Sequence, residues 1–168
     1  MTVISDGSTA SSVLIAYLAD YPQFLPVVTG WIFDEGGWEM PGSTLENIQS
    51  EFSQHLNRDR IPLTMLALID GQPAGTASIF VHDMETRMEL SPWLAAVYVM
   101  PEFRGQGIGS QLVLAIEETG RRMKLERLYL FTPDRASFYA RLGWSVFEVV
   151  EFRNRSNVIM IKSLLEEY

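Results

Sequence analysis

Three glycines follow a run of apolar residues near the middle of the chain, and this combination can bind phosphate. The run 93–99 is typical of a buried β-strand, and Pro101 ends it because proline has no backbone N–H to donate. Gly105, Gly107 and Gly109 come next, directly before apolar residues at the three- and four-residue spacing of a helix. The first turn of a helix has free N–H groups and the positive end of the helix dipole, and glycines let an anion approach them closely. We therefore expect a phosphate-binding turn here.

The phosphate loops of two large groups of nucleotide-binding proteins do not fit this stretch. The Walker loop needs Lys followed by Ser or Thr after its glycines, and no Lys occurs between Arg104 and Gly120. The dinucleotide fingerprint needs its third glycine where Ser110 stands. The pattern that does fit is Arg/Gln-x-x-Gly-x-Gly/Ala, which is matched by Arg104, Gly107 and Gly109.

This pattern closely resembles the pyrophosphate loop of the GNAT superfamily of N-acetyltransferases. A downstream segment is similar to a second signature of that family, Phe138-Tyr139-Ala140-Arg141-Leu142-Gly143-Trp144. The resemblance covers residues 63–164 well. It implies the acyl-CoA N-acyltransferase fold, with acetyl-CoA as co-substrate and no metal.

The resemblance also implies which positions hold acetyl-CoA. Coenzyme A carries a pyrophosphate and a pantetheine arm, and the amides of that arm can pair with an exposed strand edge. The matching positions are Val97, Tyr98 and Val99 for pantetheine, Arg104, Gly105, Gln106, Gly107, Ile108, Gly109 and Ser110 for pyrophosphate, and further along Thr132 and Phe138. Thr132 stands where many relatives have an Asn that contacts pantetheine, so we expect a weaker hydrogen bond at this position.

Tyr139 stands where the family usually keeps a tyrosine that gives a proton to the departing thiolate. A phenol pKa near 10 and a thiol pKa of about 8.5 make that transfer uphill by about 2 kcal/mol. The chain has no cysteine, so an acetyl-cysteine intermediate is excluded and direct transfer in a ternary complex is expected. Two competing interpretations are that Tyr139 only packs the short helix, and that the chain is a non-catalytic acyl-CoA-binding sensor or docking module.

The general base and the acceptor are left open. The strand 93–99 has no carboxylate, although many relatives have one on this strand. Candidates for the base occur in two loops and are Asp34, Glu35, Glu39, His82, Asp83 and Glu85. From the resemblance we expect a primary amine as the acceptor, and a small cationic amine is favoured over a peptide α-amine or lysine. Acyl groups other than acetyl stay open as donors.

Charge is distributed unevenly along the chain. Residues 1–57 contain seven acidic residues and no Lys or Arg, and the net charge of the whole chain is −8. The acidic N-terminal segment suits a cationic acceptor, whereas the basic segment 104–141 suits an anionic cofactor. We therefore expect Asp34 and Glu35 to attract the acceptor. An acidic chain without a basic tract argues against nucleic acid as a partner.

The length of 168 residues predicts a single domain over 1–168, and the resemblance implies that it is an N-acetyltransferase domain. It divides into a helical acceptor-side region, 1–60, and an acetyl-CoA-binding core, 61–168. No apolar run approaches the ~20 residues of a membrane span, so we expect no membrane partner. A cytoplasmic monomer or homodimer is the expectation.

Local patterns predict a mixed α/β domain. Asp20 is predicted to cap an early helix that ends at Gly36-Gly37, with Pro26 delaying or kinking its start. The box Ser43-Thr44-Leu45-Glu46 opens a second helix, whose buried stripe is Leu45, Ile48, Phe52 and Leu56. The remaining elements are strands 62–69, 74–81, 93–99, 127–131, 144–152 and 158–164, helices 107–124 and 133–143, and turns at Asp70-Gly71 and 154–157. We expect a mostly antiparallel sheet of six to seven strands flanked by about four helices, the order found in the GNAT fold.

Overall fold

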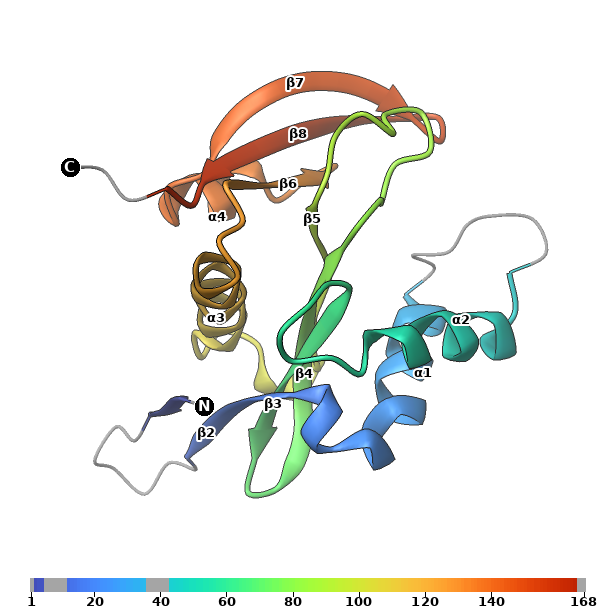
Figure 1. Ribbon diagram of the computed structural model, residues 1–168, viewed down its shortest axis with the longest axis vertical. Helices are drawn as coiled ribbons and strands as arrows, with labels where there is room; N and C mark the ends of the chain where they lie inside the picture. Colours follow the sequence, from blue (N-terminus) through green and yellow to red (C-terminus); the bar gives the residue numbers. More distant parts are fainter. Residues whose placement is uncertain (1, 5–11, 36–42, 166–168) are drawn as a thin grey trace.

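One continuous β-sheet forms the centre of the protein (Figure 1), which we describe from a computed structural model covering residues 2–4, 12–35 and 43–165. The strand order across the sheet is β1-β2-β3-β4-β5-β6-β8-β7. The strands are β1 (Thr2–Ile4), β2 (Val13–Tyr17), β3 (Leu63–Ile69), β4 (Gln72–Phe80), β5 (Trp93–Val99), β6 (Arg127–Thr132), β7 (Ser145–Phe152) and β8 (Arg155–Ser163). Neighbouring strands are antiparallel except for β5 and β6, which are parallel.

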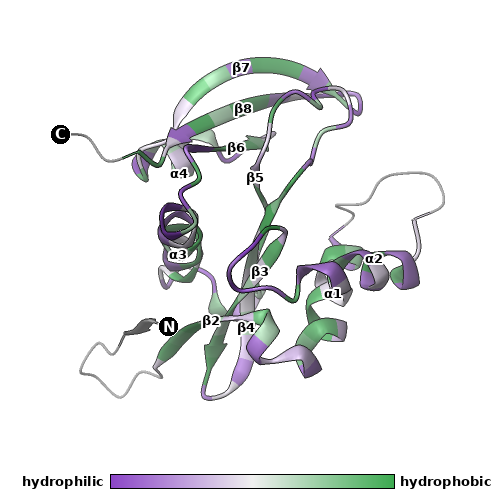
Figure 2. Ribbon diagram, in the orientation of Figure 1, coloured by the Kyte–Doolittle hydropathy of each residue, from purple (hydrophilic) through white to green (hydrophobic). Residues whose placement is uncertain are grey.

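Helices cover both faces of the sheet. The helices α1 (Leu25–Asp34) and α2 (Leu45–Phe52) pack on one face, and α3 (Ile108–Arg122) and α4 (Ala136–Arg141) pack on the other (Figure 1). Two apolar cores result, one under α1 and α2 around Phe52 and Trp93, and one under α3 around Leu112 and Ile116. Figure 2 shows β2 and β3, between these layers, coloured largely as hydrophobic.

The predicted mixed α/β class is confirmed. The sheet consists of the seven strands β2 to β8 and, at one edge, the three-residue strand β1. The sequence did not predict β2. Its five residues are apolar, but a short strand needs a partner, and here the partner is β3, far along the chain. Non-local pairing of this kind leaves no local pattern to read.

The boundaries of the early helices differ from the prediction. Asp20 caps no helix and instead forms an ion pair with Arg58. The helix α1 starts after two short 3₁₀ turns, with Pro26 in its first turn, where its missing N–H is harmless. Thr44, rather than Ser43, caps α2 by accepting the backbone N–H of Asn47.

Some details of the second helix and the turns also change. Leu45 is exposed rather than part of the buried stripe of α2. The last hairpin turns at Arg153 and Asn154, both at positive φ, and not over 154–157, because a two-residue turn of this twist matches the twist of paired strands. The expected end of the first helix at Gly36-Gly37 lies outside the described residues. The hairpin turn at Asp70-Gly71 is present as predicted.

Candidate active site

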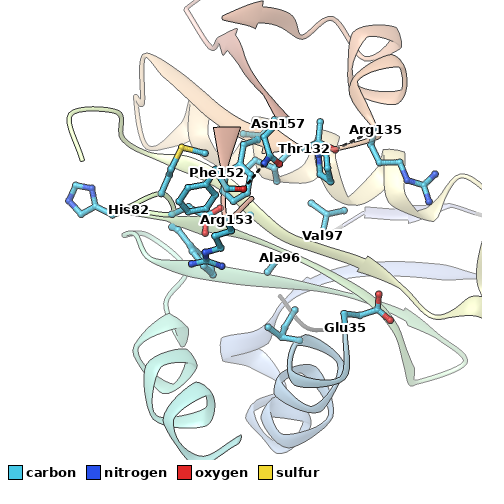
Figure 3. A pocket seen from close by; sticks show the side chains of 18 of the residues that line it. Glu35, His82, Ala96, Val97, Thr132, Arg135, Phe152, Arg153 and Asn157 are labelled. Atoms are coloured by element: carbon cyan, nitrogen blue, oxygen red, sulfur yellow. Dashed lines mark hydrogen bonds between the residues drawn. The ribbon is translucent and has the colours of Figure 1, made fainter. Parts of the chain in front are cut away.

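The two parallel strands in the middle of the sheet separate almost as soon as they meet. β5 and β6 share one register pair, Trp93 with Tyr129, and no further pair among the described residues. The separation opens a cavity of about 580 Å³ between the carboxyl-terminal halves of the two strands. Ligands of sheet proteins commonly bind at such an opening. Figure 3 shows this cavity with Val97 and Thr132 in its wall.

A β-bulge shapes the β5 side of the cavity. Between Ala95 and Tyr98, β5 has one more residue than the facing segment of β4, and Ala96 adopts a left-handed conformation with φ of 54°. Bulges bend a strand and increase its twist, which turns this part of β5 away from β6. The edge of β5 at Val97 therefore faces the cavity without a neighbouring strand, and it can pair with the amides of an extended ligand.

The glycine-rich turn lies between the end of β5 and the start of α3. Gly105 and Gly107 have φ of 77° and 82°, and nothing lies within 4 Å of where a Cβ would be at either position. No side chain caps α3, and its first helical bond runs from the N–H of Gln111 to the carbonyl of Gly107. The N–H groups of the first turn therefore have no side-chain cap among the described residues, an arrangement that suits an anion such as a pyrophosphate.

Arg104 ties this turn to the cavity. Its Nε donates a hydrogen bond to the Val99 carbonyl at 2.8 Å, and its guanidinium lies 5.5 Å from the centre of the Tyr98 ring. Tyr98 also lines the cavity and packs against Trp31 of α1, at 5.3 Å between ring centres. The loop itself lies outside the cavity lining, at its edge next to the end of β5.

Tyr139 reaches the cavity from α4 on the far side of the opening. It is 8% exposed, and its ring packs edge-on against Phe138 and Trp144. Burial raises the pKa of Tyr139 to about 12, and nearby Arg135 opposes part of that rise. The hydroxyl therefore keeps its proton at every physiological pH and is available as a hydrogen-bond donor.

Phe138 contacts the ring of Tyr139, and Thr132 lines the same cavity as Tyr139. Thr132 ends β6 and lines the cavity, and its Oγ1 accepts the N–H of Arg135 at 2.9 Å, which fixes the start of α4 (Figure 3). The Thr132 hydroxyl donates to no described residue, so its proton can form one hydrogen bond to a ligand. Phe138 lies over the start of α3, where its ring is 3.7 Å from the place of a Cβ on Gly109.

The opposite end of the cavity is acidic. Asp83, in the loop after β4, has its carboxyl partly open to the cavity but closely surrounded by the chain. Desolvation raises the pKa of Asp83 to about 8, Arg153 opposes the rise, and Glu51 and Glu85 add to it. Burial also raises the pKa of Glu51, which faces the cavity from α2.

Arg153 is held at this end by the turn between β7 and β8. Its side chain forms an ion pair with Glu85 at 3.3 Å and lies over the Phe152 ring. Asn157 fixes the turn, because its Nδ2 donates to the carbonyls of Phe152 and Arg155. Figure 3 shows His82 at one side of the view, Arg135 at the other and Arg153 between them.

The predicted acceptor residues separate in the structure. Glu35 lines the cavity at the end of α1, whereas its neighbour Asp34 is exposed and does not line it. Sequence reasoning named Asp83 only as one of several candidates, and it missed Glu51 and Arg153. These three come from segments far apart in the chain, and no local spacing connects them.

Within residues 2–4, 12–35 and 43–165, no group of three or more His, Cys, Asp or Glu side chains is arranged to hold a metal ion. In the same described part of the chain, no helix is long and apolar enough to cross a membrane.

A sequence model of the acetyltransferase (GNAT) family matches residues 29–144. The chain belongs to this family. It is 33% identical over 104 residues to N-alpha-acetyltransferase 80 of Mus musculus, and 33% identical over 106 residues to S-alkylcysteine N-acetyltransferase of Bacillus subtilis. Each match covers 58% of this chain, which spans 33% of the mouse protein and 60% of the bacterial one.

Among solved structures, a GNAT-type fold recurs over nearly the whole chain. A putative acetyltransferase from Salmonella typhimurium with its cofactor acetyl-CoA superposes with a TM-score of 0.69 at 16% identity, over 92% of this chain and 95% of that one. At this identity the likeness shows the fold alone. The family and fold expected from Arg104, Gly107 and Gly109 are therefore confirmed.

Proposed function

We propose that this GNAT domain is an N-acetyltransferase that moves the acetyl group of acetyl-CoA directly to a primary amine in a ternary complex. One observation carries the proposal: the opening between β5 and β6 joins an anion-binding turn at its edge to a buried tyrosine and an acidic wall inside. These are the parts that an acyl-CoA thioester, a leaving thiolate and a cationic amine each require.

Each part of the site has a chemical role in this proposal. The loop from Arg104 to Ser110 binds pyrophosphate through backbone N–H groups, and the free edge at 97–99 pairs with pantetheine, with Thr132 and Phe138 beside it. Acetyl-CoA supplies the activated acetyl group. A backbone N–H of 97–99 polarises the acetyl carbonyl, and the Tyr139 hydroxyl donates its proton toward the departing sulfur.

The raised pKa of Tyr139 is compatible with this role. Full transfer from a phenol of pKa about 12 to a thiolate whose thiol pKa is about 8.5 is uphill by about 5 kcal/mol. A reaction with a turnover of about 10 s⁻¹ has a barrier of about 16 kcal/mol, so this cost fits within it.

We propose a small cationic amine as the acceptor. Support comes from the carboxylates that contribute to the cavity lining, which are Glu51 and Asp83 at its acidic end and Glu35 at the end of α1. The names of the two relatives, an N-alpha-acetyltransferase and an S-alkylcysteine N-acetyltransferase, both describe amine acceptors.

A thiol-release assay with a panel of amines tests the proposal. We expect amine-dependent release of coenzyme A thiol, and a rise in melting temperature with acetyl-CoA. Gly107→Glu should abolish both, because its side chain places negative charge where the pyrophosphate is expected to bind. Gly71→Glu is a matched control: Gly71 has φ of 80° and the same free space, but it lies in the hairpin turn between β3 and β4.

The outcomes of this assay separate the alternatives. Both variants should lose about 1 kcal/mol of stability or slightly more, since a side chain at positive φ is strained. Only Gly107→Glu should lose the acetyl-CoA effect. Binding of acetyl-CoA by the wild type without turnover of any amine would instead identify a non-catalytic acyl-CoA-binding module. Equal acetyl-CoA binding by Gly107→Glu and wild type would show that the loop is wrongly assigned.

A further inference from the structure

The site as described lacks a group to take the proton from the acceptor amine. An ammonium has no lone pair, so the amine must lose a proton before it attacks the acetyl carbon. The residues of β5 that line the cavity are apolar or aromatic, and β5 has no carboxylate. The base must therefore come from another element that faces the cavity.

Four carboxylates contribute to the lining of the cavity, and they differ in what surrounds them: Glu35, Glu51, Asp83 and Glu85. Glu85 is exposed and paired with Arg153 at 3.3 Å. Glu35 is exposed at the end of α1. Asp83 is enclosed by the chain, faces the cavity and makes no hydrogen bond or ion pair with any described residue.

We propose that Asp83, with Glu51 beside it, binds the acceptor's ammonium group and removes the proton that the amine must lose. This inference rests on the N-acetyltransferase function proposed above. Asp83 lies in the loop directly before β5, so it faces the same cavity that Val97 and Tyr139 line, and it can act directly or through one water.

The protons balance as follows. One proton moves from the acceptor nitrogen to an Asp83 carboxylate oxygen and then to solvent. The nitrogen lone pair forms the bond to the acetyl carbon, and the carbon–sulfur bond breaks as the sulfur receives a proton from the Tyr139 hydroxyl. The nitrogen loses its second proton on becoming an amide, and that proton restores Tyr139. The net products are the amide, the free thiol and one proton.

The charges that face Asp83 suit a base that works near neutral pH. Glu51 from α2 and Glu85 from its own loop disfavour ionisation, and Arg153 from the turn between β7 and β8 favours it. Together with desolvation, these three charges place the pKa of Asp83 at about 8 in the empty site. A bound ammonium group then lowers the pKa of Asp83 from this raised value. The carboxyl therefore ionises as the cation binds and is then able to accept a proton.

The test is the pH dependence of kcat/KM in wild type and Asp83→Asn. With Nα-acetyl-lysinamide, the wild-type value should rise through pH ~8 as Asp83 ionises, and fall above pH ~10 as the acceptor loses its charge. Asp83→Asn should lose about 10²–10⁴-fold at pH 8 and should rise only with deprotonation of the acceptor itself, without a fall at high pH. Glu118→Gln, which removes one exposed charge of α3 outside the cavity, is the control and should keep the wild-type profile.

Glu51→Gln gives an independent readout. Removing this neighbouring carboxylate should lower the Asp83 pKa and move the acidic limb of the wild-type profile to lower pH, while the alkaline limb stays in place. A purely structural role of Asp83 predicts no such shift. Retention of the acetyl-CoA thermal shift by both variants confirms that they fold.

The outcomes distinguish this inference from the proposed function. If wild type acetylates amines but Asp83→Asn keeps both limbs of the profile, Asp83 is not the base and the inference is overturned. If wild type acetylates no amine at any pH, the proposed function itself fails.

Discussion

Replacing Tyr139 with Phe removes one hydroxyl from the cavity and leaves its ring between Phe138 and Trp144. With a pKa of about 12, the hydroxyl acts mainly as a donor to the developing thiolate. A hydrogen bond to a charged group is worth about 1.5–3 kcal/mol, or about 10- to 150-fold in rate, and general acid catalysis contributes about 10²–10⁴-fold. The two ranges meet near 10², which is the loss of turnover that we expect.

Stability and acetyl-CoA binding should change little in Tyr139→Phe. The Tyr139 hydroxyl makes no hydrogen bond with any described residue, so its removal should alter the free energy of unfolding by less than about 1 kcal/mol. The matched control is Tyr129→Phe. Tyr129 is also 8% exposed and packed between aromatic rings, but it does not line the cavity.

Single-turnover measurement with saturating acetyl-CoA isolates the chemical step from product release. We expect Tyr129→Phe to match wild type and Tyr139→Phe to be slower by about two orders of magnitude. A Tyr139→Phe rate within about threefold of wild type, with an unchanged acetyl-CoA thermal shift, would refute the proton-donor role and leave the residue as packing.

Two further predictions concern other titratable groups. His55 is buried against Phe52, and desolvation lowers its pKa to about 4. The unfolded chain then binds more protons than the folded chain between pH ~6.5 and ~4. Urea titrations should therefore show that the free energy of unfolding falls by about 3 kcal/mol as the pH falls through this window. In His55→Gln, this part of the pH dependence of the free energy of unfolding should be absent. Glu35→Gln, at an exposed position of the cavity lining, should raise the acceptor KM about twofold at low salt and should leave it unchanged at high salt. Asp34→Asn, outside the cavity lining, should leave the acceptor KM unchanged at both salt concentrations. Equal effects of the two substitutions would contradict the placement of Glu35 at the cavity.

The sequence predicted well the parts of the fold that depend on neighbours in the chain. Strand β5 has the expected bounds, and the hairpin at Asp70-Gly71 has the expected turn, since apolar runs and paired turn residues are local signals. The strand β2 was missed because it is defined by pairing with β3. Pro26 was correctly expected to delay α1, because proline has no N–H for a helix interior.

The candidate site was only half visible in the sequence. The glycine turn and Tyr139 belong to contiguous motifs, so their types and spacing could be read directly. The acidic end was not visible, because Glu51, Asp83 and Arg153 come from a helix, a loop and a hairpin turn that meet only in the folded chain. The pKa of Asp83 depends on that enclosure, and Asp83 therefore looked the same as any other loop aspartate.

The bulge in β5 links the fold to the chemistry. The antiparallel neighbour β4 holds β5 on both sides of the bulge, where Ser78 faces Ala95 and Thr76 faces Tyr98. Gly75 makes this close pairing possible, since a Cβ there would lie 2.8 Å from the Tyr98 carbonyl oxygen. The left-handed conformation of Ala96 costs about 1 kcal/mol or slightly more, because alanine has a Cβ. The paired segments on either side of the bulge maintain this strained conformation. The bulged conformation leaves the side of β5 that faces β6 unpaired, and this side forms a wall of the cavity.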